Sequence, residues 1–180
     1  MQTKDALTSM LHSGQATSEV ALQCFDALES VSLDFMIGRW RGAEIATSHP
    51  MDGLLAATNW YGKEFVDPET VHPLLFLNEQ GHLFKVAPNL IAMRLGLKLP
   101  FAKHKAVRPL LRLLTSLSQT DTSQARLRMM DYRHQVSATM IYDRLPINDS
   151  FRKIDDHTVF GAMDFKDLPQ PFFFVLHRDP

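Results

Sequence analysis

The sequence predicts a single domain with a mainly β fold, an antiparallel barrel or a strongly curved sheet. Short segments rich in aromatic and β-branched residues follow one another with hairpin-length connections. Long helices do not alternate with these segments, as a parallel sheet would require. In the pentapeptide 38–42, Gly-Arg-Trp-Arg-Gly, two glycines flank one tryptophan. That pattern suits the first strand of a small barrel, where the ring fills one end and the glycines let neighbouring strands approach.

About nine strands are expected. The first contains Trp40, and a hairpin turn at 78–81 joins two of the others. The remaining segments are 60–66, 71–77, 82–86, 127–133, 136–142, 151–154, 158–165 and 172–178.

Two segments are expected to be helical. Apolar residues recur at three- and four-residue steps through 18–31, which predicts an amphipathic helix. A second apolar stripe lies within 88–118, where Pro109 is placed to start a helix. This basic helical insertion separates an N-terminal part, 18–87, from a C-terminal strand set, 124–178, within one domain spanning 1–180. Residues 80–120 contain no acidic residue and seven basic ones: Lys85, Arg94, Lys98, Lys103, Lys105, Arg108 and Arg112.

The amino-acid composition argues against several classes of protein, including disordered, nucleic-acid-binding and membrane-spanning proteins. Of the 180 residues, 45% are hydrophobic, as in a chain with a substantial core. Lysine and arginine number 19 against 20 acidic residues, so no overall positive field favours nucleic acid. No apolar run is long enough to span a membrane and no secretion signal is evident, which predicts a cytoplasmic protein. Cys24 is the only cysteine and lies among apolar residues, which indicates a buried, inert thiol.

Three further motifs follow the pentapeptide along the chain. They are His-Pro-Met-Asp-Gly at 49–53, Trp-Tyr-Gly-Lys at 60–63 and Val-His-Pro-Leu at 71–74. With these motifs the N-terminal part resembles the GXWXG family.

The C-terminal part resembles the domain of unknown function that follows the GXWXG segment in that bacterial family. The matching motifs are at 138–143, 146–152, 155–156, 161–164 and 172–174. The resemblance implies a lipocalin-like, calycin-type barrel and brings no settled activity. His134 and Asp167 stand where the family usually has glycine. Because a residue with a β-carbon disfavours a positive φ, the usual turn or bulge is in doubt at both positions.

Three polar residues are the candidates for acid–base or orienting roles. If strands alternate faces, Lys63 shares a side with Tyr61 and Phe65, and His72 shares one with residues 74 and 76. A lysine in an apolar interior needs a carboxylate partner, and Asp164 is one candidate. An outward-facing or purely structural role remains the alternative for Lys63 and His72.

Charged residues, Asp149 among them, cluster around two expected strands and their connection. Asp155 and Asp156 are interpreted mainly as part of a turn, and a carboxylate pair for acid–base work is the alternative. Asp155 and Asp156 are adjacent, so on a strand they would face opposite ways. We therefore expect residues 155–157 to cap a hairpin, with Arg152 pairing with Asp149 or Asp156.

No metal-binding pattern is present, because the eight histidines are scattered and no second thiolate joins them. A haem-binding barrel is a separate alternative, since some small haem-binding barrels carry a similar Gly-x-Trp-x-Gly element and use one histidine. His177 on the last strand is the candidate ligand, and a solvent-edge position is the competing interpretation.

The leading functional hypothesis is a carrier that binds a hydrophobic or amphipathic small molecule, such as a fatty acid or an isoprenoid, without a cofactor. An isomerase, dehydratase or cyclase using Lys63, His72 or Asp164 in the same cavity is the alternative. The 88–118 segment is expected to be either a lid, whose lysines meet an anionic ligand head group or an anionic membrane surface during loading, or a surface helix that covers the barrel end. Homodimerisation is left open. The predicted ligand-binding residues are Trp40, Trp60, Tyr61, Lys63, His72, Phe76, Met140, Tyr142, Asp164 and Phe174.

Overall fold

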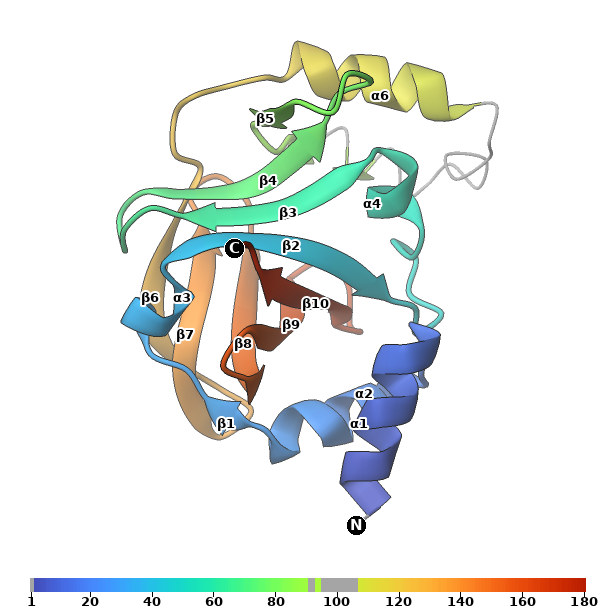
Figure 1. The fold of residues 1–180 in the computed structure, drawn as a ribbon, viewed down its shortest axis with the longest axis vertical. Coiled ribbons are helices and arrows are strands. Elements are labelled where there is room, and N and C mark those ends of the chain that lie inside the picture. The colour runs from blue at the N-terminus through green and yellow to red at the C-terminus, as the bar shows by residue number, and fades with distance from the viewer. Residues whose placement is uncertain (1, 91–92, 95–106) are drawn as a thin grey trace.

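A computed structural model describes residues 2–90, 93–94 and 107–180. Antiparallel strands dominate it and a few helices cover them (Figure 1). The strands are β1 (Glu29–Ser30), β2 (Gly38–Ile45), β3 (Trp60–Phe65), β4 (Val71–Leu77), β5 (Leu83–Lys85), β6 (Ala125–Tyr132), β7 (Gln135–Tyr142), β8 (Ile147–Asp155), β9 (Thr158–Phe165) and β10 (Phe172–Arg178). The helices are α1 (Gln2–Ser13), α2 (Ser18–Ala27), α3 (Leu33–Met36), α4 (Leu54–Ala57) and α6 (Arg108–Leu117).

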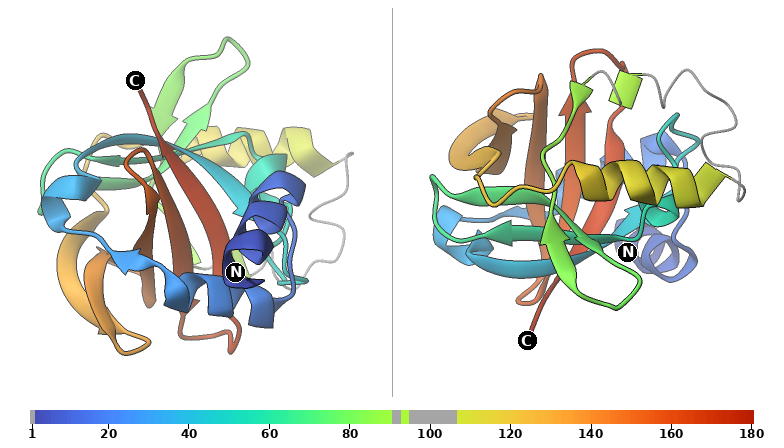
Figure 2. Two further views of the ribbon diagram at one scale, coloured as in Figure 1. Left: turned by 60° about the horizontal axis from the view of Figure 1, so that its bottom comes forward. Right: turned by 90° about the horizontal axis from the view of Figure 1, so that it is seen from above.

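The strands pair in a ring. The order is β8-β7-β6-β4-β3-β2-β10-β9, and β9 pairs with β8 again (Figure 2). Every pairing between these strands is antiparallel. The short strands β1 and β5 add to β8 and β4. The predicted antiparallel, mainly β architecture is therefore confirmed.

Two hydrophobic cores use the two faces of the ring. Inside, Trp40 packs with Phe65, Phe151 and other apolar side chains. On the outer face of β9 and β10, a second core contains Phe25 and Phe173 and is covered by α1 and α2. Both faces of β10 are thus buried, which explains the uninterrupted phenylalanine run 172–174.

The N-terminal helices differ in part from expectation. Thr17 caps α2, because its hydroxyl accepts the backbone N–H of Val20. The helix ends at Ala27, earlier than predicted, and the chain then forms β1. The preceding helix α1 was not expected; Met10 anchors it in the outer core.

The connection between β6 and β7 has only two residues. Arg133 and His134 have φ angles of 56° and 65°, and Tyr132 pairs with Gln135 across the turn. Both central residues thus take the left-handed conformation that a tight hairpin requires. His134 adopts the geometry usually given to glycine, whereas Asp167 is not among the positive-φ residues.

Helix α6 lies across the end of the ring that is at the top of Figure 1, on the side of the molecule away from α1 and α2. Pro109 is in its first turn, as predicted. The predictions for 91–92 and 95–106, including Lys98, Lys103 and Lys105, fall outside the described residues. Among the helices described, none has the length and apolar character to cross a membrane.

Candidate functional site

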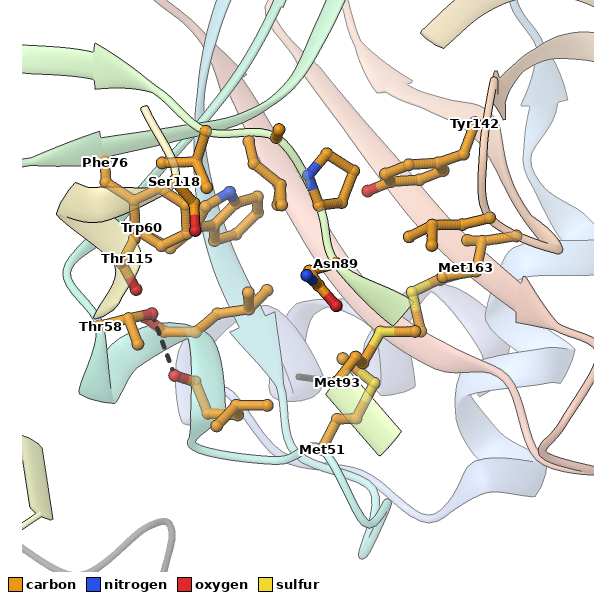
Figure 3. Close-up of a pocket in the computed structure, with 18 of the residues that line it drawn as sticks. Met51, Thr58, Trp60, Phe76, Asn89, Met93, Thr115, Ser118, Tyr142 and Met163 are labelled. Carbon is orange, nitrogen blue, oxygen red and sulfur yellow. Dashed lines mark hydrogen bonds between the residues drawn. The ribbon is translucent and has the colours of Figure 1, made fainter. Parts of the chain in front are cut away.

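A cavity of about 640 Å³ opens inside the ring at the end covered by α6. Its wall is mainly apolar and includes the methionines Met51, Met93 and Met163, which Figure 3 shows on one side. The opposite part of the interior is filled by the aromatic core, where Phe65 and Phe151 meet edge to face at 5.7 Å. The ring is therefore packed at one end and hollow at the other.

A buried ion pair lies in the cavity wall. Lys63 Nζ is 2.8 Å from Asp149 Oδ2, and their side chains are 4% and 1% exposed. Lys63 also donates a hydrogen bond of 3.3 Å to the carbonyl of Pro73. The two charged residues come from β3 and β8, which are four strands apart in the ring order. The pair therefore joins opposite sides of the interior.

Three aromatic rings surround the lysine ammonium. Nζ lies 5.0 Å from the ring centroid of Phe174, 5.7 Å from that of Trp60 and 5.8 Å from that of Tyr142. Ring faces attract a cation through their quadrupoles. The positive charge is thus compensated by these rings as well as by Asp149.

A β-bulge turns Lys63 inward together with Trp60. The register between β3 and β4 shifts on both sides of Gly62, so strict alternation of faces fails there. A β-carbon at Gly62 would collide with the carbonyl of Trp40, so only glycine fits this close approach. As a result Trp60 and Lys63 both line the cavity, while the hydroxyl of Tyr61 donates to Asp179.

Burial controls the ionisation of the acidic groups at the pair. Burial raises the pKa of Asp149, and the neighbouring Lys63 opposes this shift. Burial, together with the charge of Asp149, raises the pKa of Tyr142 well above its usual value. The phenol of Tyr142 is therefore a neutral donor and acceptor at physiological pH.

The pair retains unused hydrogen-bonding capacity. Asp149 Oδ1 is buried and has no hydrogen-bond partner among the described residues, and the same is true of Trp60 Nε1. Uncompensated buried polar atoms are unfavourable in a purely structural role. Their position in a cavity wall is typical of a site that receives a ligand.

Glu44 fixes one side of the cavity. Its carboxylate accepts backbone N–H groups of Gly53, Leu55 and Ala56 at 2.8, 2.8 and 3.3 Å. These contacts hold the start of α4, whose residues Leu54 and Leu55 line the cavity. Burial raises the pKa of Glu44, and the three hydrogen bonds oppose that shift.

Half of the predicted ligand-binding residues meet at the cavity. They are Trp60, Lys63, Phe76, Tyr142 and Phe174.

Trp40 and Met140 lie instead in the interior core, and the Trp40 indole donates to the carbonyl of Met36 at 2.8 Å. His72 is buried on β4, opposite Glu64 of β3, rather than in the described cavity wall, and its pKa is lowered by burial and by Lys85. Tyr61 faces away from the wall because of the bulge at Gly62.

The predicted partner of Lys63 was wrong. Asp164 is exposed, because it is out of phase with Met163, which faces the cavity. The ion-pair partner of Lys63 is Asp149. Asp149 was expected in a connection between two strands, whereas strand β8 already begins at Ile147. Alternation through 147, 149 and 151 was the signal that could have placed Asp149 on the interior face of a strand.

The turn at 155–157 is confirmed, since Asp155 Oδ1 accepts the backbone N–H of His157 at 2.8 Å. The expected ion pair of Arg152 is wrong, because Asp156 pairs with Lys153 at 2.6 Å and Asp149 pairs with Lys63. Arg152 is itself buried and donates to the carbonyls of Tyr132 and Gln135.

The described residues contain no group of three potential metal ligands. His177, the candidate haem ligand, is exposed, and its Nδ1 lies 3.3 Å from the hydroxyl of Thr158. No histidine belongs to the described cavity wall.

Comparison with known proteins agrees with the motifs. The family model "GXWXG protein" matches residues 23–81, and the model "Domain of unknown function (DUF4334)" matches residues 123–178. A solved structure, described as the crystal structure of a protein from Thermomonospora curvata, is 31% identical with a TM-score of 0.73, and the alignment covers all of both chains. A search of curated proteins gave no match. The chain therefore belongs to the GXWXG family and has the DUF4334 domain at its C-terminal end.

Proposed function

We propose that the protein binds a hydrophobic or amphipathic small molecule, fatty-acid-like or isoprenoid-like, in the cavity beneath α6. The observation on which the proposal depends is an apolar cavity of about 640 Å³ with a buried ion pair in its wall. Small-molecule sites are typically of this size, mostly apolar, with a few polar groups that orient the ligand. Lys63, Asp149 and Tyr142 are those groups here.

The ring of strands is, in this proposal, a lipocalin-like barrel that holds its ligand at the open end. The closed order of strand pairings and the cavity at one end support this interpretation. Leu111 of α6 lines the cavity, so the helix forms part of the cover.

A dye-binding experiment tests the proposal. Nile red is uncharged and fluoresces in apolar surroundings, so its emission reports occupancy of the cavity. Leu111→Trp should reduce binding at least about tenfold by filling the cavity. Leu113→Trp is the matched control, because Leu113 is on the same helix and 56% exposed.

The proposal fails if Nile red does not bind and native mass spectrometry of freshly purified protein detects no bound small molecule. Equal binding by the Leu111→Trp and Leu113→Trp variants would also contradict it, because the dye would then be outside the cavity.

An enzyme acting on an apolar substrate is the second candidate. It is favoured by one observation: a carboxyl group with a raised pKa lies beside a lysine in a cavity wall. Asp149 would then take up a proton from a carbon next to the carbonyl of an unsaturated substrate and return it to another carbon of the resulting dienolate, which shifts the double bond and completes an isomerisation. A long-chain methyl ketone incubated with the protein in deuterated water should gain deuterium faster than with the Asp149→Asn variant. Equal rates would exclude this candidate.

A further inference from the structure

The cavity wall contains one positive and one negative residue, and they neutralise each other. Among the described residues that line it, Lys63 and Asp149 are the only ones with charged side chains. Their atoms are 2.8 Å apart. A ligand therefore meets a wall with no net formal charge.

From this arrangement we infer that the site selects a ligand with an uncharged oxygen-bearing head group, a hydroxyl or a carbonyl, over a carboxylate of the same chain length. The inference rests on the proposed function and specifies its ligand class.

The surroundings of the pair favour this selection. Lys63 is already compensated by Asp149, the carbonyl of Pro73 and three aromatic rings. The atom of the pair left without a partner is an acceptor, Asp149 Oδ1. An incoming carboxylate would bring a second negative charge near this buried oxygen in an apolar enclosure, where like charges repel strongly.

Tyr142 supplies the complementary contact. Figure 3 shows its hydroxyl directed toward the middle of the lining residues. Because its phenol stays protonated, it can donate to a carbonyl oxygen or exchange hydrogen bonds with a hydroxyl group. A neutral head group is thus accommodated without separating Lys63 from Asp149.

Dodecanol and dodecanoate form the matched ligand pair for the test. Each displaces Nile red from the wild-type protein at about pH 8, where dodecanoate is ionised. Dodecanol is expected to bind at least about tenfold more tightly. Equal or tighter binding of dodecanoate would overturn the inference and leave the proposed function intact, whereas failure of both ligands and of the dye to bind would overturn the function itself.

A variant reverses the expected selectivity. Asp149→Asn keeps the shape of the side chain and leaves the positive charge of Lys63 without its carboxylate. Dodecanoate binding should then strengthen relative to dodecanol by at least about tenfold. Asp164→Asn removes an exposed carboxylate from the neighbouring strand and should not alter the ratio.

A double variant, Lys63→Met with Asp149→Leu, covers the case in which Asp149→Asn does not fold. With both charges removed, repulsion by Asp149 is absent, so the preference for dodecanol over dodecanoate should be smaller than in the wild-type protein. An undiminished preference in this variant would contradict the inference, because repulsion by Asp149 could then not be the basis of the selection.

Discussion

The indole ring of Trp60 lies directly over Gly42, in the space that a β-carbon at this position would occupy. Gly42 follows Trp40 by two residues on β2, so both face the interior. The second glycine of the pentapeptide is therefore needed for the placement of a neighbouring aromatic residue, and that residue is part of the cavity wall.

Gly42→Ala should move the Trp60 ring and lower the free energy of unfolding by about 1–3 kcal/mol, as overpacking commonly does. Urea denaturation measures the loss, and Nile red binding reports the altered wall. The double variant Gly42→Ala with Trp60→Phe should lose less than the sum of the single changes, because the smaller ring relieves the collision. Additive losses would show that the two residues are not coupled.

Breaking the buried ion pair should be costly, whereas replacing both partners should not. Lys63→Met or Asp149→Leu alone leaves a buried charge unpaired and should lower the free energy of unfolding by about 3–5 kcal/mol. The double variant should recover most of this loss. Urea denaturation distinguishes the three proteins, and a double variant as unstable as the worse single variant would refute the expectation.

His72 should contribute a loss of stability in acid. Burial and Lys85 lower its pKa from the usual 6.5, against weaker opposing effects of Glu64 and Asp121. The unfolded chain then binds this proton more readily, so the contribution to stability is present above pH 6.5 and is lost as the pH falls through the folded pKa.

The measurement is urea denaturation of wild type and His72→Gln across the range from about pH 8 down to about pH 5. The difference in unfolding free energy should shift in favour of the variant as the pH falls. Parallel curves would show that His72 is not responsible.

The turn between β6 and β7 offers a stabilising change. His134 has a φ of 65°, which is unfavourable for a residue with a β-carbon. His134→Gly should raise the free energy of unfolding by about 1 kcal/mol. Asp167→Gly is the control, because Asp167 has no positive φ to relieve and glycine there adds only flexibility. A stabilisation of the control as large as that of His134→Gly would refute the assignment.

Strand periodicity predicted most of the architecture and part of the site. The segments rich in aromatic and β-branched residues are strands in the structure, and the predicted residues Trp60, Lys63 and Tyr142 line the cavity. Tyr61 was misplaced because a bulge at Gly62 interrupts alternation, and a bulge depends on contacts with another strand that local periodicity does not contain.

The partner of Lys63 could not be found from local pattern alone. Asp149 and Lys63 are far apart in the sequence and meet only because β3 and β8 lie across the ring from each other. The polar residues that flank Asp149 in the sequence suggested a turn. The pairing of β8 with β7 and β9 instead places Asp149 within a strand, on its interior face.

The position of the ion pair also bears on how the two family segments depend on each other. Lys63 belongs to the first matched segment and Asp149 to the second. Neither segment produced separately would contain both ends of this contact, and each would leave unpaired strand edges where β2 meets β10 and β4 meets β6. The two matched segments are thus halves of one folding unit. Expressing them as separate chains would yield fragments prone to aggregation rather than two independently folded domains.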